Sequence, residues 1–338
     1  MTSKRIFSTI QYVFFLLLGF GLLWLSFRKL NMHQVYHEIA NAHYGWLFLS
    51  LAVTLLSHII RAARWNLLIE TLNYKTRLST TFYSLMTGYM VNIVVPRLGE
   101  FVRCGVLSKK EKIPFAALFG TVVSERIFDL IVLLLLIFMV IIFQMQLLSE
   151  FLHKFFGPFF HMVFSNFWTI FIIALVFVIL VVLAFLYWES NKERFKKKAF
   201  YIKIHKFTVG LIDGIKTIKD MKRKGLFLLY TFLIWFLYIL MIYIAFFMLK
   251  ETSHLNFDAA ITILVIGSLG IVAPVPGGIG AYHFIVKAAL TEIYNINGNA
   301  AISFATLTHA GQTLLNIVVG GFSYMIILLT KNQTPKNE

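Results

Sequence analysis

The sequence predicts an all-α, polytopic membrane protein with about six full transmembrane helices and two re-entrant helical hairpins. Of its 338 residues, 59% are hydrophobic and only 14% are charged, whereas soluble domains carry about 25% charged residues. Apolar stretches of about 20 residues recur along the chain, which is the length that about 30 Å of hydrocarbon requires. Two other apolar stretches are interrupted by proline and glycine. We expect residues 1–338 to form a single transmembrane domain.

Six segments are long and apolar enough to span a bilayer. They are residues 6–27, 44–69, 127–148, 165–188, 226–249 and 302–330. The first follows Lys4 and Arg5, as a secretory signal would. It is too long for a signal peptide, and Arg28 and Lys29 follow it instead of a small-residue cleavage site. We therefore expect it to be a retained helix.

The net charge of +16 orients the chain in the membrane. Residues 191–224 contain twelve Lys and Arg residues against three acids, and such loops stay in the cytoplasm. Counting spans backward places residues 97–112 on the same side. Both termini are then expected on the cytoplasmic side of a bacterial plasma membrane. No basic–aromatic pattern typical of nucleic-acid binding accompanies this charge, so nucleic acid is not an expected partner.

The positive-inside rule also predicts the two hairpins. If residues 78–95 spanned the membrane, both basic segments would be moved outside, so this stretch should enter from the cytoplasm and return, with residues 114–125 nearby. By the same argument, residues 258–290 should dip in from outside. Residues 88–99 and 267–280 resemble each other locally. They suggest an inverted repeat, in which broken helices from two halves meet at a transport site.

The first candidate cluster follows the first broken stretch. Pro96 and Gly99 should break the helix and free backbone amides, which together with Arg97 and Arg103 suit a phosphate group. Glu100 lies three residues before Arg103, so the two can pair. The alternative is an interfacial basic loop that only sets the topology. Asn92, just before this cluster, is a weaker polar candidate.

A second cluster places Glu125, Arg126 and Asp129 on one face of a helix at the entry to an apolar span. Ionisable groups inside a membrane are costly unless paired. They therefore either line a substrate cavity or form a self-neutralising group that locks helices together. Arg61 and Arg64, three residues apart, either extend to cytoplasmic headgroups or contact a lipid phosphate.

The clearest backbone signal is the segment 273–280. Pro274 and Pro276 should end one helix, and the glycines that follow permit a tight reversal before the next helix begins near Ala281. Three glycines form this reversal, namely Gly277, Gly278 and Gly280. A helix N-terminus inside the membrane is an anion site. His283 and Lys287, four residues apart, share a face of that helix and suggest a hydrated cavity.

Metal and cofactor sites are not expected. The single cysteine, Cys104, excludes a cysteine-based metal site, and the histidines lack a convincing ligand set. His309, Gln312 and Asn316 follow one stripe of the last span, a pattern typical of hydrogen bonding between helices.

Together these motifs resemble the lysylphosphatidylglycerol synthase transmembrane-region family. The resemblance runs from about residue 6 to residue 330 and rests on four motifs in order, Arg61-x-x-Arg64-Trp65, Asn92-x-x-x-Pro96-Arg97-x-Gly99-Glu100-x-x-Arg103, Glu125-Arg126-x-x-Asp129 and Pro274-x-Pro276-Gly277-Gly278-x-Gly280. It implies lipid translocation, with aminoacylated phosphatidylglycerol the best-known substrate of the family and with other members tied to hopanoid or glycolipid pathways.

Two departures from the family pattern change the expected substrate. No soluble aminoacyltransferase domain follows residue 330, so synthesis of an aminoacyl lipid is not expected. His283 stands where the family often has an acid, which favours an anionic headgroup or pH-sensitive binding over a cationic headgroup.

The leading hypothesis is therefore a flippase-like transporter of an anionic or amino-modified phospholipid or glycolipid. No nucleotide site is visible, so transport would be passive or ion-coupled. The alternatives are a membrane enzyme that modifies lipid headgroups, with Glu125 or Asp129 as base, and a non-transporting partner of a lipid-synthesis enzyme. The sequence is also compatible with a homo-oligomer. The candidate substrate-binding residues are Arg61, Arg64, Asn92, Arg97, Glu100, Arg103, Glu125, Arg126, Asp129, Gly277, Gly278, Gly280, His283 and Lys287.

Overall fold

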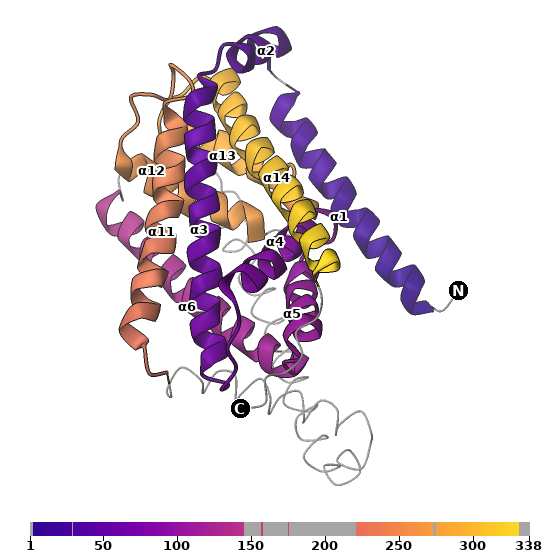
Figure 1. Ribbon diagram of the computed structural model, residues 1–338. Helices are drawn as coiled ribbons and strands as arrows, with labels where there is room; N and C mark the ends of the chain where they lie inside the picture. Colours follow the sequence, from indigo (N-terminus) through magenta and orange to yellow (C-terminus); the bar gives the residue numbers. More distant parts are fainter. Residues whose placement is uncertain are drawn as a thin grey trace.

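The computed structural model describes residues 3–28, 30–144, 221–272 and 275–330, together with the isolated positions Gly157 and Leu175. Within these residues every regular element is a helix, which confirms the all-α prediction (Figure 1). The elements are α1 (Ser3–Phe27), α2 (Met32–Ala40), α3 (Tyr44–Glu70), α4 (Leu78–Val94), α5 (Leu98–Glu111), α6 (Phe115–Phe143), α11 (Lys224–Phe246), α12 (Phe257–Val272), the 3₁₀ turn η1 (Pro276–Gly278), α13 (Ala281–Glu292) and α14 (Gly298–Leu329).

Four of the described helices are long and apolar enough to cross a membrane, namely α3, α6, α11 and α14. A fifth span results if α1 and α2, which meet at an angle of 92°, are counted as one broken span. Large apolar side chains on these helices are exposed along their length, including Phe138 (62% exposed), Phe232 (66%) and Phe322 (63%). Such surfaces require a lipid environment. The predicted span 165–188 and most of the basic loop 191–224 lie outside the described residues.

One predicted boundary is wrong. Residues 114–125 do not form a separate piece beside the first hairpin, because they belong to a single helix, α6, that continues unbroken to Phe143. Pro114 occupies the N-cap position just before the helix, where its missing N–H breaks no hydrogen bond. The charged residues that suggested a break are tolerated inside the helix because they are paired, as described below.

The first hairpin consists of α4 and α5, which pack against each other in antiparallel directions. Its first helix begins beside the end of α3, where the hydroxyl of Thr81 donates to Asn66 Oδ1 at 2.6 Å. Its second helix finishes beside the end of α14, where Lys110 Nζ donates to the carbonyl oxygen of Ile327 at 2.8 Å. The hairpin therefore enters and leaves at the end of the molecule where α3 and α14 end.

The second hairpin consists of α12, η1 and α13, and it enters from the opposite end. It follows α11, whose end contacts the beginning of α3 through a hydrogen bond from His43 N to the carbonyl oxygen of Met248 at 2.9 Å. It leads into α14, whose first turn contacts the beginning of α2 through Asn31 N and Asn299 Oδ1 at 3.2 Å. Two opposed re-entrant hairpins are therefore present, as the sequence predicts. The placement of residues 97–112 on the cytoplasmic side is wrong for most of that segment, because α5 is the returning helix of the first hairpin and Arg97 lies at its tip in the interior.

The order of elements is that of an inverted repeat. One unit is α3, the first hairpin and α6, and the other is α11, the second hairpin and α14 (Figure 1). Since the two hairpins enter from opposite ends, the two units run in opposite directions. Their tips meet inside the molecule, where α4 packs against η1. A Cβ added at Gly277 would lie 3.4 Å from the carbonyl oxygen of Ile93 at the tip of α4.

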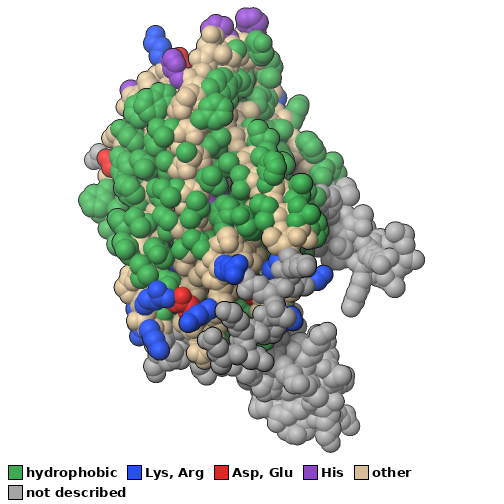
Figure 2. Space-filling model, viewed as in Figure 1, with side chains coloured by type: hydrophobic (Ala, Val, Ile, Leu, Met, Phe, Trp, Pro, Cys, Tyr) green, Lys and Arg blue, Asp and Glu red, His purple; other side chains and the backbone are tan. Residues whose placement is uncertain are grey.

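Charge separates the two ends of the molecule. In the view of Figure 2, hydrophobic side chains cover the middle of the molecule and Lys and Arg gather at the lower end, where α3 ends and α11 begins, whereas His is concentrated at the upper end. The described basic residues of the lower end include Lys75, Arg77, Lys109, Lys112 and Lys222. This pattern is typical of a membrane protein with a cationic face on one side.

The two helices of the first hairpin approach each other closely at Gly88 and Gly99, which leaves no room for a larger residue at Gly99. A Cβ added at Gly99 would lie 2.1 Å from the carbonyl oxygen of Gly88, a backbone atom that cannot move aside. Gly99→Ala should therefore lower the free energy of unfolding by about 1–3 kcal/mol or more, measured as a lower melting temperature in detergent. Gly105→Ala on the same helix is the control, since nothing lies within 4 Å of a Cβ there. Equal melting temperatures for the two variants would contradict this packing.

Candidate functional site

A cavity of about 770 Å³ lies where the tips of the two hairpins meet. It is lined by residues of α3, both hairpins, α6, α11 and α14, so both inverted units contribute to it. Seven of the predicted site residues line it, namely Arg61, Asn92, Arg97, Glu100, Arg126, Gly277 and Gly278. The predicted residues Arg64, Arg103, Glu125 and Asp129 lie behind the cavity wall, and Gly280, His283 and Lys287 lie elsewhere.

The wall is held together by a buried carboxylate. Glu125 of α6 has no exposed surface, and its two oxygens contact Arg61 Nε at 2.8 Å and Arg103 Nη1 at 3.2 Å. Guanidinium nitrogens of Arg64 and Arg126 lie at 3.5 Å and 3.6 Å from the same carboxylate. One glutamate on α6 therefore joins α3, α5 and its own helix.

A second carboxylate extends this ion network toward α11. Asp129 accepts hydrogen bonds from Arg61 Nη2 at 2.7 Å and from Arg64 Nη2 at 2.8 Å. Arg61 also donates to the hydroxyl of Tyr238 at 2.8 Å, and Arg64 donates to Thr231 at 3.2 Å. Arg61 and Arg64 are 6% and 0% exposed, so neither extends to lipid headgroups as one of the sequence interpretations proposed.

The expected pairing within the first cluster is replaced by pairing with α6. Glu100 does not pair with Arg103; it lies 3.6 Å from Arg126 and accepts a hydrogen bond from Asn92 Nδ2 at 3.2 Å. Arg103 instead turns to Glu125, and its guanidinium stacks over the ring of Trp65 at 4.7 Å. A fully buried carboxylate without partners would cost more than one that is 24% exposed, as Glu100 is, so Arg103 pairs with Glu125.

The tip of the first hairpin leaves one arginine free. Arg97 adopts a left-handed conformation with φ 65° between α4 and α5, is exposed, and lines the cavity. Among the described residues no ion pair involves it. The predicted free amide at Gly99 is occupied, because Gly99 N donates to Asn92 Oδ1 at 2.6 Å. Anion binding at this tip therefore depends on the side chain of Arg97 and not on that amide.

The tip of the second hairpin is fixed by backbone contacts. Gly277 and Gly278 have φ of 59° and 73°, which suit glycine, and His309 Nε2 is 2.8 Å from the carbonyl oxygen of Gly277. Gly280 packs against α1, since a Cβ there would lie 2.0 Å from the carbonyl oxygen of Gly19. The N-terminus of α13, predicted as an anion site, is therefore covered by α1 and does not face the cavity.

The remaining two predicted residues have structural contacts. His283 is buried and its ring lies 4.9 Å from that of His309. Lys287 Nζ donates to the carbonyl oxygen of Ser26 at 2.7 Å, near the end of α1. Their four-residue spacing placed them on one face, as expected, but that face packs toward α1 and α14. They do not line the cavity as the sequence suggested.

Several lining residues were missed or given another role. His309, Gln312 and Asn316 all line the cavity. The predicted contacts between elements are also present for two of them, because His309 Nε2 contacts the carbonyl oxygen of Gly277 and Gln312 Nε2 contacts Met241 Sδ. His58 lines it as well, one turn before Arg61 on α3, with its ring 4.8 Å from that of Tyr89. The signal for His58 was available, because a three-residue spacing places it on the same face as Arg61.

The cavity carries an excess of positive charge. Among the residues that the structure describes, three arginines and one glutamate line it, which leaves two positive charges in excess. The glutamate, Glu100, is itself held by Asn92 and Arg126. Within the described residues no group of three His, Cys, Asp or Glu residues is placed to hold a metal ion. The arrangement is suited to binding an anion.

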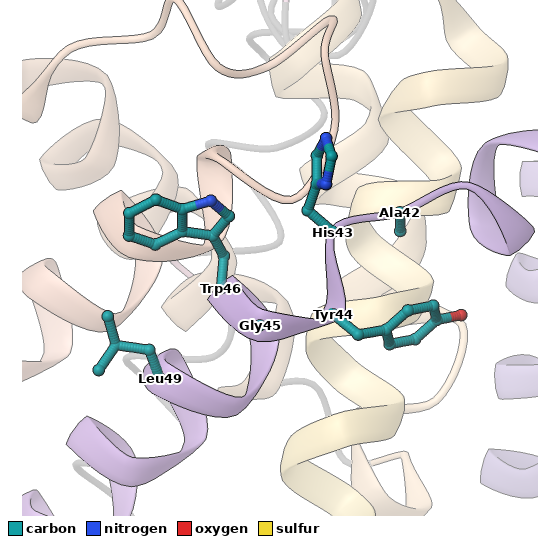
Figure 3. A pocket seen from close by; sticks show the side chains of 6 residues that line it. All are labelled: Ala42, His43, Tyr44, Gly45, Trp46 and Leu49. Atoms are coloured by element: carbon teal, nitrogen blue, oxygen red, sulfur yellow. The ribbon is translucent and has the colours of Figure 1, made fainter.

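A second hollow, of about 560 Å³, lies at the surface where α3 begins. Figure 3 shows Trp46 and Tyr44 pointing to different sides of the helix start, with His43 at the turn before it. The ring of Trp46 lies 5.2 Å from that of Phe247 at the end of α11. Aromatic residues at helix ends mark the membrane–water boundary, so we assign this hollow to the interface and not to a binding site.

The fold and the cavity define a polytopic helical membrane protein built from two opposed helix–hairpin–helix units. The chain belongs to the Lysylphosphatidylglycerol synthase TM region family, which it matches over residues 12–320.

Two curated relatives come from Methanocaldococcus jannaschii. UPF0104 membrane protein MJ1595 is 26% identical over 132 residues, which cover 38% of this chain and 37% of that protein. UPF0104 membrane protein MJ1078 is 25% identical over 251 residues, which cover 73% of this chain and 98% of that protein. No solved structure matches the chain.

Proposed function

We propose that the protein moves a lipid with an anionic headgroup between the two leaflets of the membrane. The observation that carries this proposal is the amphipathic lining of the cavity at the meeting point of the hairpins. Its charged wall is formed by Arg61, Arg97 and Arg126, and an apolar wall is formed by Phe101, Phe119, Val122 and Val123 of α5 and α6. A headgroup fits the first wall and an acyl chain fits the second.

The apolar wall continues to the outer surface of the helices, which favours a lipid over a water-soluble anion. Phe101 lines the cavity and is 47% exposed, and its ring stacks on that of Phe119 at 4.8 Å. Val94 and Leu98, at the tip of the first hairpin, are 61% and 41% exposed. A lipid could keep its chains against these residues while its headgroup lies among the arginines, so the chains need not enter the polar part of the cavity.

The ion network argues against the enzyme hypothesis. Both oxygens of Glu125 accept hydrogen bonds from arginines, and both oxygens of Asp129 do the same. A general base needs a free lone pair within reach of the substrate, and Glu125 has no exposed surface. The two carboxylates fit a role in holding the cavity wall better than a role in proton abstraction.

The distribution of charge supports an orientation. We place the end of the molecule with Lys75, Lys109 and Lys112 in the cytoplasm, because short loops rich in Lys and Arg stay on that side. Both chain termini and the base of the first hairpin then lie on the cytoplasmic side of a bacterial plasma membrane. The base of the second hairpin lies on the external side.

Leaflet exchange in reconstituted vesicles tests the function. Vesicles with the protein should exchange acyl-labelled phosphatidylglycerol between leaflets faster than protein-free vesicles, measured by reduction of the fluorophore from outside. Gln312→Trp fills the cavity and should reduce the exchange rate at least about tenfold, the effect of removing roughly 1.4 kcal/mol of stabilisation from the translocating lipid. Leu314→Trp is the control, since Leu314 lies two residues away and is 62% exposed. Exchange at the protein-free rate with the wild-type protein would overturn the proposal.

A further inference from the structure

One wall of the cavity carries uncharged polar groups that the ion network does not use. They belong to His58 of α3 and to Gln312 and Asn316 of α14. His58 is 7% exposed, and neither ring nitrogen makes a hydrogen bond within the described part of the chain. Oδ1 of Asn316 is buried and has no hydrogen bond there either. The two side chains are close enough to interact, but they do not reach hydrogen-bond geometry.

Gln312 is also poorly satisfied. The contact found for its amide nitrogen is to Met241 Sδ at 3.9 Å, which is a weak acceptor. Buried polar groups without partners are costly in a native protein, and each requires an explanation. The buried ring of His58 and the buried Oδ1 of Asn316, on one cavity wall with the weakly bonded amide of Gln312, are explained by a ligand that supplies both hydrogen-bond donors and acceptors. A hydroxyl group does so, since it donates one hydrogen bond and accepts two.

The charges that line the cavity disfavour the binding of a lipid with a cationic headgroup. An ammonium group would need an unpaired carboxylate, and Glu100, the one carboxylate that lines the cavity within the described part of the chain, already contacts Asn92 and Arg126. Arg61, Arg97 and Arg126 would repel such a group. The free charge of Arg97 at the first hairpin tip suits a phosphate instead.

We propose that the cavity selects phospholipids whose phosphate carries an uncharged, hydroxyl-rich headgroup. The phosphate is held by Arg97 and Arg126, and the hydroxyl groups are held by His58, Gln312 and Asn316. This inference rests on the proposed lipid transport and adds the class of headgroup to it. It separates lipids that have the same charge and differ only in hydroxyl groups.

Leaflet exchange of three acyl-labelled lipids tests this selectivity. Phosphatidylglycerol and phosphatidylethanol carry the same single negative charge, but only the former has headgroup hydroxyls. Phosphatidylethanolamine carries an amine. The wild-type protein should exchange phosphatidylglycerol about three- to tenfold faster than phosphatidylethanol, a factor equivalent to one or two hydrogen bonds, and should exchange phosphatidylethanolamine more slowly still.

Substitutions at His58, Gln312 and Asn316 test whether these residues cause the preference for phosphatidylglycerol over phosphatidylethanol. Asn316→Leu and His58→Phe should lower the ratio of the phosphatidylglycerol rate to the phosphatidylethanol rate from about three- to tenfold to about one. A melting temperature in detergent close to that of the wild type shows that each variant is folded, and a variant that fails this check is replaced by the milder Gln312→Leu. Equal wild-type rates for the three lipids, or a preference that survives all these variants, would overturn this inference alone. Absence of exchange for every lipid would overturn the proposed function.

Discussion

Glu125→Ala should destabilise the protein by about 3–5 kcal/mol, the range found when one partner of a buried ion pair is removed. The carboxylate of Glu125 is fully buried and contacts Arg61 and Arg103 directly, with Arg64 and Arg126 within 3.6 Å. Its removal leaves one carboxylate, Asp129, to balance the arginines of α3 and leaves Arg103 without its anion. The cost arises from these unpaired buried cations more than from the lost contact itself.

The free energy of unfolding in mixed detergent micelles measures this effect. Glu70→Ala is the matched control, because Glu70 pairs with Arg223 at the surface and both side chains are more than a third exposed. Exposed pairs contribute about 0–1 kcal/mol, so this variant should unfold close to the wild type. If Glu125→Ala were no less stable than Glu70→Ala, the buried network would not hold α3, α5 and α6 together as described.

Arg97→Asn should reduce lipid exchange about 10- to 100-fold and leave stability nearly unchanged. Arg97 is exposed, lines the cavity and has no ion pair among the described residues, so its charge is available to a phosphate. A hydrogen bond to a charged group contributes about 1.5–3 kcal/mol, which corresponds to this loss of rate. Asparagine tolerates the left-handed backbone at this position (φ 65°), so the substitution removes the charge without straining the hairpin tip.

Two further variants make the result specific. Arg97→Lys keeps the positive charge and should retain most of the exchange activity. Arg77→Asn removes an exposed arginine just before α4 and should have no effect on the rate. Equal rates for Arg97→Asn and Arg77→Asn would show that the free arginine does not contact the translocating lipid.

The fold was largely predictable because apolar length and the charge of the loops can be read from short stretches of sequence and summed along the chain. Apolar length predicts the spans α3, α11 and α14, and the basic segments fix the parity that requires re-entrant hairpins. The boundary predicted between residues 114–125 and the following span was wrong because it depends on contacts with other helices, which are not local. Charged residues in the middle of α6 were taken as the boundary of a span, whereas buried partners on other helices allow the helix to continue through them.

The site was less predictable because its contacts are distant in sequence. Helical spacing shows which residues share a face, as with Glu100 and Arg103, but does not show which partner each one prefers. The partner of Arg61 lies 64 residues away, and that of Arg103 lies 22 residues away. Glycine likewise signals close packing at Gly280 without showing that α1 is the element that packs there.

Lipid transport through the cavity requires that two re-entrant hairpins enter the membrane from opposite faces and meet there. Single cysteines introduced in a Cys104→Ser background test it, with labelling by an impermeant maleimide in oriented vesicles. Lys75→Cys and Lys109→Cys bracket the first hairpin, and Ser253→Cys and Asn295→Cys bracket the second, at exposed positions. The first pair should be labelled from one side and the second pair from the other. Labelling of the two members of either pair from opposite sides would show that the segment spans the membrane, and would contradict the presence of a re-entrant hairpin there.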